Sequence, residues 1–313
     1  MPFDSDTEEF LKAVPRSRST YEPGLNWFQE FLLSLPEYQG VQAPLKVFLD
    51  RVAEDQDLPK RERKRVDRNA LRGFVPFLQE REKSTKTINT YMTAVQSLGS
   101  YFEISLTTKF LNVPRPRVQT KSHPWKPEEI ANFIALLKGP LHQCTCATFY
   151  QSGLGISDTL LLTYGDIQKE YEAGIVPLCF DLARYKTGVE HRTFISTEAV
   201  ELLHRHFKTN GVPKPDEHLF QITDRAIQGI FARRAKKLLK SWDYRNPMSP
   251  HSIRKGFRKM VVNAGCPESY AEYWMGHNLE SDLRKTYTAM STDEWRAEYS
   301  KYMTALSFKL PLS

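Results

Sequence analysis

A proline-rich stretch at residues 112–125 sets the strongest limit on how this chain can fold. It reads NVPRPRVQTKSHPW, with three prolines, four basic side chains if His123 is counted, and no acidic side chain. Proline removes a backbone donor and restricts the residue before it, so a long helix cannot run through the segment. We therefore expect an extended linker at residues 114–124 that joins two separately folded parts of the 313-residue chain.

The part before the linker has the apolar spacing of a helical domain, which we place at residues 21–113. The expected helices cover residues 26–35, 43–52, 60–83 and 84–103. Pro76 is expected to kink or break the third, and Ser84 or Thr85 to cap the fourth. Residues 1–20 are charged and rich in Ser and Thr, which predicts a flexible arm.

The part after the linker, residues 125–313, mixes helical spacing with one alternating segment. Residues 176–185 and the return run 191–196 flank a Lys-Thr-Gly sequence, which predicts a β-hairpin. Helices are expected at residues 127–137, 141–151, 197–209, 224–242 and 251–263, and in a C-terminal tail. The predicted fold class is mainly α with a small antiparallel β-sheet (α+β).

Composition narrows the choice of partner. The net charge of +7 and pI near 9.1 favour an anionic partner, and nucleic acid is the first candidate. No apolar run is long enough to span a membrane, and the acidic N-terminus does not resemble a signal peptide, so we expect a cytoplasmic protein. The four cysteines lack the spacing of a zinc site and are expected to be reduced thiols, so no metal is predicted.

The chemically richest stretch runs from His251 to Tyr287. His251 and Arg254 stand three residues apart and share one face of the predicted helix. A guanidinium and an imidazole on one face suit a phosphate, although such a pair also occurs on plain protein surfaces. His277 follows a Met-Gly pair, and Tyr287 comes ten residues later.

This order and spacing resemble the tyrosine recombinases of the phage integrase family: an H-x-x-R box, a Gly-His pair, then a tyrosine. The resemblance implies a helical core-binding domain and an integrase-type catalytic domain. It also implies that His251, Arg254 and His277 activate a DNA phosphate and that Tyr287 is the nucleophile. Lys186, in the hairpin, matches the family's lysine that protonates the leaving 5′ oxygen.

Residues 152–167, SGLGISDTLLLTYGDI, resemble the family's first arginine box, but the catalytic arginine position holds Gly155. This departure predicts a weakened or inactivated site. An alternative is that Arg184 is a substitute, because positions 184 and 186 face the same side of a strand.

The resemblance implies double-stranded DNA carrying a specific recombination site as the partner, and a homo-oligomer on DNA, expected to be a tetrameric synapse. It implies no cofactor and no membrane, with action on nucleoid DNA. Alternatively, the basic segments are solvated helical surfaces that bind no ligand. The candidate DNA-binding residues are Lys60, Arg61, Lys64, Arg65, Arg68, Lys86, Asn89, Thr90, Arg115, Arg117 and Lys121.

The predicted function is therefore site-specific DNA recombination or integration, typical of mobile genetic elements, through a 3′-phosphotyrosine intermediate. One alternative is a non-catalytic DNA-binding protein that retains the recombinase fold. A type IB topoisomerase-like or telomere-resolving enzyme would share the nucleophile chemistry. A small-molecule phosphate enzyme is disfavoured, because the sequence lacks a glycine-rich phosphate loop.

Overall fold

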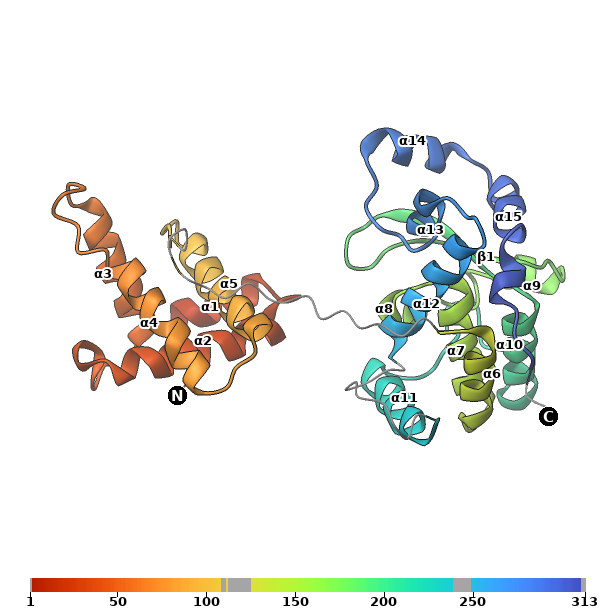
Figure 1. The fold of residues 1–313 in the computed structure, drawn as a ribbon, viewed down its shortest axis with the longest axis horizontal. Helices are drawn as coiled ribbons and strands as arrows, with labels where there is room; N and C mark the ends of the chain where they lie inside the picture. Colours follow the sequence, from red (N-terminus) through yellow and green to blue (C-terminus); the bar gives the residue numbers. More distant parts are fainter. Residues whose placement is uncertain (1, 108–110, 112–124, 239–248, 311–313) are drawn as a thin grey trace. The chain divides into compact units, whose positions relative to one another are not determined.

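The computed structural model describes residues 2–107, 111, 125–238 and 249–310. The chain divides into two compact units, Met1–Gln119 and Thr120–Ser313 (Figure 1). Helices dominate both, and the described part of the second holds a two-stranded antiparallel sheet. The predicted fold class is therefore confirmed. Within the described ranges, every helix is too short or too polar to span a bilayer.

The first unit is built on a core of phenylalanine rings. Phe28 meets both Phe48 and Phe74 edge to face, with centroids 5.0 Å apart in each pair, a favourable geometry for aromatic rings. Ser84 caps α5 by accepting a hydrogen bond from the Thr87 N–H, as predicted. The elements are α1 (Ser5–Ala13), α2 (Arg18–Ser34), the short 3-10 helix η1 (Pro36–Tyr38), α3 (Pro44–Asp57), α4 (Val66–Glu80) and α5 (Thr85–Tyr101).

The first twenty residues are not the flexible arm that the sequence suggested. The carboxylate of Asp4 caps α1 by accepting from the Thr7 N–H at 2.9 Å. Phe10 and Leu11 are buried in the core of this unit. The prediction was wrong because a charged composition hid two apolar residues that are enough to dock one short helix.

The basic run at residues 60–65 is a loop, whereas the sequence predicted that it begins a helix. Asp55 holds the end of this loop, because its carboxylate accepts from the backbone N–H groups of Lys64 and Val66. Arg65 adopts a left-handed conformation with φ of 57°, and α4 begins only after it. Of the kink or break predicted at Pro76, the break does not occur: α4 continues through it, since one lost hydrogen bond is outweighed by burial of the flanking Val75 and Phe77.

The second unit surrounds the buried helix α7, in which every residue from Cys144 to Ser152 is buried. α7 packs against α10 and α12, and the hairpin pairs Phe180 with Thr193. Its elements are α6 (Pro127–Leu136), α7 (Pro140–Ser152), α8 (Ile156–Leu161), α9 (Gln168–Glu172), β1 (Leu178–Ala183), β2 (Glu190–Ile195), α10 (Thr197–Asn210), α11 (Asp224–Leu238), α12 (Pro250–Asn263), α13 (Glu268–Trp274), α14 (Ser281–Ala289), α15 (Thr292–Ser300) and η2 (Met303–Leu306).

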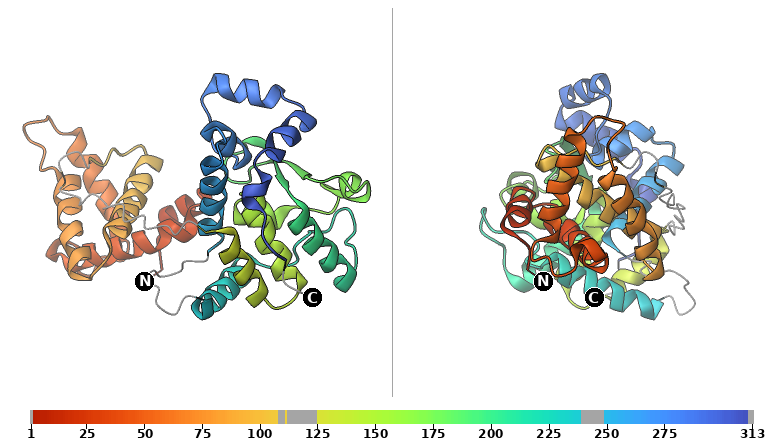
Figure 2. Two further views of the ribbon diagram at one scale, coloured as in Figure 1. Left: turned by 45° about the vertical axis from the view of Figure 1, so that its right-hand side comes forward. Right: turned by 90° about the vertical axis from the view of Figure 1, so that its left-hand side faces the viewer.

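Helix α14 lies at the edge of this unit, and α15 brings the chain back to the core (Figures 1 and 2). Tyr287 is the one buried residue of α14. The described tail packs on its own unit, since Tyr299, Leu306 and Phe308 belong to the core. The Phe308 N–H donates to the carboxylate of Glu198 at 3.2 Å, which fixes the tail in place.

Candidate active site

The β-hairpin between β1 and β2 presents two of the predicted site residues. The Arg184 N–H donates to the Val189 carbonyl at 2.9 Å, and the Gly188 N–H donates back to the Arg184 carbonyl at 2.7 Å. Gly188 has a φ of 68°, a conformation that glycine adopts without strain. Lys186 lies exposed in this turn, and Arg184 is half-buried at its base.

The first arginine box forms a sharp turn between α7 and α8. Gly153 ends α7 in a left-handed conformation, and Gly155 is the N-cap of α8. Asp158, three residues further on, is buried, and one of its carboxylate oxygens accepts from the Tyr185 N–H at 2.9 Å. Its other oxygen lies 3.8 Å from Arg184 Nε. The turn that lacks an arginine therefore carries a carboxylate that reaches the hairpin.

Helix α12 carries His251 and Arg254, and Ser249 caps its N-terminus. Arg254 is only 4% exposed. Its guanidinium donates to the Gly153 carbonyl at 2.7 Å and to the Met275 carbonyl at 2.6 Å. Burial and the nearby charge of Arg184 lower the pKa of Arg254 to about 10. The carboxylates of Asp158 and Glu272 raise this pKa but do not cancel the effect, so the guanidinium is a cation that is costly to bury.

Arg184 and Arg254 meet at the segment that precedes His277. Arg184 Nη1 donates to the Gly276 carbonyl at 3.2 Å, one residue beyond the Met275 carbonyl that accepts from Arg254. Two guanidiniums are thus fixed on consecutive carbonyl groups. The structure brings together Arg184, Arg254 and the turn at Gly155.

The two histidines have different surroundings. His277 Nδ1 is paired with the carboxylate of Glu272, which also binds Arg258. Burial alone would raise the pKa of Glu272, but hydrogen bonds from His277 and Arg258 hold that pKa below its usual value. A carboxylate at Nδ1 fixes the ring's orientation and leaves Nε2 as the outward-facing nitrogen. His251 is exposed in the first turn of α12.

A third histidine, His191, is buried against the backbone of Gly276. It is 1% exposed, its Nδ1 lies 3.1 Å from the Val189 carbonyl, and its Nε2 has no hydrogen-bond partner among the described residues. A Cβ on Gly276 would lie 2.7 Å from this ring, so glycine is required there for the close approach. Burial lowers the pKa of His191 to about 4, from an ordinary value of 6.5.

His191 is expected to make the fold acid-sensitive. Between pH 6.5 and about 4 the unfolded chain binds a proton at His191 that the folded chain does not. Stability should therefore fall as the pH drops through this window, by up to about 3 kcal/mol. Denaturant unfolding at several pH values measures the effect. His191→Gln should flatten the profile, and an unchanged slope would contradict the assignment.

Tyr287 is anchored away from hydrogen-bond contact with this cluster. Its hydroxyl donates to Ser269 Oγ at 2.8 Å, and the side chain is 7% exposed. Its ring packs edge to face against Tyr270, Tyr273 and Trp295. The described structure therefore holds Tyr287 in an aromatic pocket, with its hydroxyl bound to Ser269.

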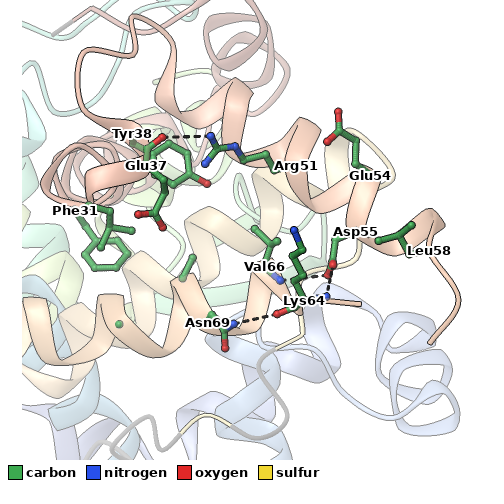
Figure 3. Close-up of a pocket in the computed structure, with 13 residues that line it drawn as sticks. Phe31, Glu37, Tyr38, Arg51, Glu54, Asp55, Leu58, Lys64, Val66 and Asn69 are labelled. Carbon is green, nitrogen blue, oxygen red and sulfur yellow. Dashed lines mark hydrogen bonds between the residues drawn. The ribbon is translucent and has the colours of Figure 1, made fainter. Parts of the chain in front are cut away.

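The described DNA-binding candidates of the first unit fall on a loop and two helices. Lys60, Arg61, Lys64 and Arg65 lie exposed in the loop before α4, and Lys64 lines a pocket of about 750 Å³ between α3 and α4 (Figure 3). Arg68 follows in α4. On α5, Asn89 and Thr90 donate to the carbonyl groups four residues back. One hydrogen of the Asn89 amide and the Thr90 hydroxyl are thus engaged within the helix, which also carries Lys86. Arg115, Arg117 and Lys121 lie outside the described residues.

Comparison with known proteins decides the family. Residues 127–294 match the family model described as "Phage integrase family". The match spans more than half of the 313 residues. The chain belongs to the phage integrase family. The matched segment of this integrase family member runs from α6 into α15, so it contains each candidate catalytic position from Gly155 to Tyr287.

Curated relatives and solved structures agree with the assignment. The chain is 27% identical over 260 residues to the ICEBs1 integrase of Bacillus subtilis, which covers 74% of this chain and 68% of the relative. It is 23% identical to the tyrosine recombinase XerA of Saccharolobus solfataricus, covering 85% of this chain and 89% of the relative. The integrase of transposon Tn1549, solved with transposon right-end DNA, shares the fold, with a TM-score of 0.53 at 19% identity and coverage of 88% and 98%.

The structure adds residues to the site that the sequence interpretation missed. Asp158 pairs with Arg184, and Glu272 pairs with His277. Ser269 accepts a hydrogen bond from the hydroxyl of Tyr287. Asp158 was detectable in principle, because a carboxylate one helical turn after the arginine position faces the same site. Ser269 carried no signal in the sequence.

Proposed function

We propose that this integrase family member is a site-specific recombinase that cleaves and rejoins DNA strands through a 3′-phosphotyrosine. The main support is a pair of neighbouring cations, the buried Arg254 and the half-buried Arg184. Arg254 donates to two backbone carbonyls, the neighbouring Arg184 is a second cation, and the carboxylate of Asp158 offsets only part of their charge. Two guanidiniums beside one carboxylate leave net positive charge that is costly to bury, and a DNA phosphodiester is an anion of suitable size to bind there.

Each candidate residue then has a defined part in cleavage. Tyr287 attacks the phosphorus in line, its phenol proton passes to water, and a P–O bond to the tyrosine forms as the bond to the 5′ oxygen breaks. Arg254, His251 and His277 donate hydrogen bonds to the non-bridging oxygens, on which charge develops. Lys186 gives the proton to the leaving 5′ oxygen. Attack by a new 5′ hydroxyl reverses these steps and reseals the strand.

A trapping experiment tests this proposal. A binding site is first selected from a random-sequence duplex library, and the duplex is then nicked beside the scissile phosphate so that the cleaved fragment diffuses away. We expect a covalent protein–DNA band on a denaturing gel, with the DNA attached to the peptide that contains Tyr287. Attachment at another residue would refute the assigned nucleophile.

The second candidate function is site-specific DNA binding without cleavage. Gly155 favours it, because loss of one oxyanion donor costs on the order of 10²–10³ in rate. It predicts a specific gel shift with no covalent band from the wild-type chain. If the site is weakened only by the missing arginine, Gly155→Arg should raise cleavage sharply.

We also propose that the exposed basic loop of the first unit, residues 60–65, contacts phosphates of the DNA backbone. Changing Lys60, Arg61 and Lys64 together to Gln should weaken binding to all sequences alike and lower the dependence of log Kd on log salt by up to about three, one for each lost phosphate contact. The control is the double change of Lys60 and Lys64 to Arg, which keeps the charge. An unchanged salt dependence in the Gln variant would contradict the contact.

Exchange of strands between two duplexes needs a cleavage at two positions on each, and so four copies of one nucleophile. We therefore propose that the protein assembles as a tetramer on paired recombination sites in nucleoid DNA. Light scattering of the trapped complex measures the stoichiometry. A complex with one protein per site and no pairing of duplexes would limit the chain to cleavage alone.

A further inference from the structure

We infer that Arg184 supplies the phosphate-binding guanidinium that position 155 lacks, and that Asp158 is the positioning residue that holds Arg184 there. This inference rests on the proposed recombinase function and specifies how its site is completed. If the inference is correct, Gly155 is not a defect, because the glycine at 155 and the arginine at 184 complete the site together.

The place of Arg184 is the first reason. It stands at the base of the hairpin whose turn carries Lys186, and its Nη1 donates to the Gly276 carbonyl, next to the Met275 carbonyl bound by Arg254. Its side chain is 22% exposed, so the group is held in the protein but open to a ligand. Among the described residues Arg184 Nη2 makes no hydrogen bond, so it can donate to a phosphate oxygen.

The bonds of Asp158 are the second reason. One carboxylate oxygen accepts from the Tyr185 N–H, and the other faces Arg184 Nε at 3.8 Å. The carboxylate therefore binds the backbone and the side chain of two successive hairpin residues. The side chain of Asp158 is only 6% exposed, which makes the pair less screened than a surface salt bridge. One carboxylate beside two guanidiniums leaves net positive charge for a phosphate.

The space around Gly155 is the third reason. A Cβ at this position would lie 2.8 Å from Asp158 Oδ2 and 3.9 Å from Arg254 Nη1. Any side chain at 155 must therefore push the carboxylate that holds Arg184. An arginine at 155 and an arginine at 184 compete for one place, so glycine at 155 is the residue that lets Arg184 occupy it.

The inference is tested by single-turnover cleavage of the nicked duplex with excess protein. Arg184→Gln should lower the rate of covalent complex formation by about 10²–10³, and Arg184→Lys should fall between it and wild type. Gly155→Arg alone should not raise the rate. The double variant with Gly155→Arg and Arg184→Gln should recover at least about tenfold over Arg184→Gln. Arg205→Gln, which removes an arginine from the surface of α10, is the matched control and should equal wild type.

The positioning role of Asp158 is tested by a measurement that a general loss of structure would not change. A methylphosphonate at the scissile position removes the negative non-bridging oxygen that a guanidinium would bind. On this substrate the rate penalty of Arg184→Gln and of Asp158→Asn, relative to wild type, should shrink by about tenfold or more. Asp158→Glu should keep most of the wild-type preference for phosphate. Thermal melting and DNA affinity report whether each variant is folded.

The outcomes separate the two levels of the proposal. If wild-type protein forms no covalent complex through Tyr287, the proposed function fails and this inference falls with it. If wild type cleaves but Arg184→Gln cleaves equally well, only the inference is overturned. A sharp gain from Gly155→Arg in the presence of Arg184 would likewise overturn it, since the site would then be one that merely lacks an arginine.

Discussion

Replacing Tyr287 by Phe is expected to abolish the covalent protein–DNA complex while leaving the fold and the DNA affinity in place. The ring would keep its contacts with Tyr270, Tyr273 and Trp295, because these do not involve the hydroxyl. Only the hydrogen bond to Ser269 is lost, which costs about 1 kcal/mol. The measurements are the trapping assay, a gel shift and a thermal melt.

Ser269→Ala is the control for that experiment, because it removes the same hydrogen bond from the other side. It keeps the nucleophile and releases its hydroxyl, so cleavage should match or exceed wild type by up to about fivefold. If both variants were inactive, the hydrogen bond rather than the nucleophile would be responsible. A covalent band that survives in Tyr287→Phe would mean that another residue attacks the DNA.

Replacing Arg254 by Met is expected to lower the cleavage rate by about 10²–10³ with little loss of stability. Two hydrogen bonds, to the Gly153 and Met275 carbonyls, disappear. At the same time a cation that is disfavoured by burial and by Arg184 is removed, and the two effects oppose each other. We expect the Tm to change by no more than about 4 °C.

The matched control for Arg254→Met is again Arg205→Gln, which should change neither the rate nor the Tm. Rates are compared at saturating protein, so that weaker binding does not pass for slower chemistry. A large fall in Tm together with lost DNA binding would assign Arg254 a mainly structural role. Retained cleavage would remove it from the site altogether.

Periodicity and spacing gave correct predictions where one local rule decides the outcome. His251 and Arg254 lie on α12, where their helical spacing predicted them, and the alternating run before Lys186 forms β1. The hydrophobic face of α5 was readable because Ile88, Met92 and Val95 recur at helical intervals.

The sequence was less informative where contacts join distant segments. Asp158 faces Arg184 across 26 positions of the chain, and no local pattern marks that pair. The loop before α4 is set by Asp55, whose carboxylate captures two backbone N–H groups and overrides the helical propensity of the Lys- and Arg-rich run. The burial of Tyr287 depends on three aromatic rings of α13 and α15 that only the fold assembles.

The anchoring of α14 by one residue affects the balance between broken and sealed DNA. Tyr287 is the buried residue of that helix, and in the proposed mechanism we expect its ring to leave the aromatic pocket when the tyrosine joins DNA. Burying such a ring is worth roughly 1.5–3 kcal/mol. Resealing the strand returns the ring to the pocket, which favours intact DNA over the protein-linked break by about 10- to 150-fold. Under the proposed mechanism, the resting position of Tyr287 therefore disfavours DNA breaks that stay open.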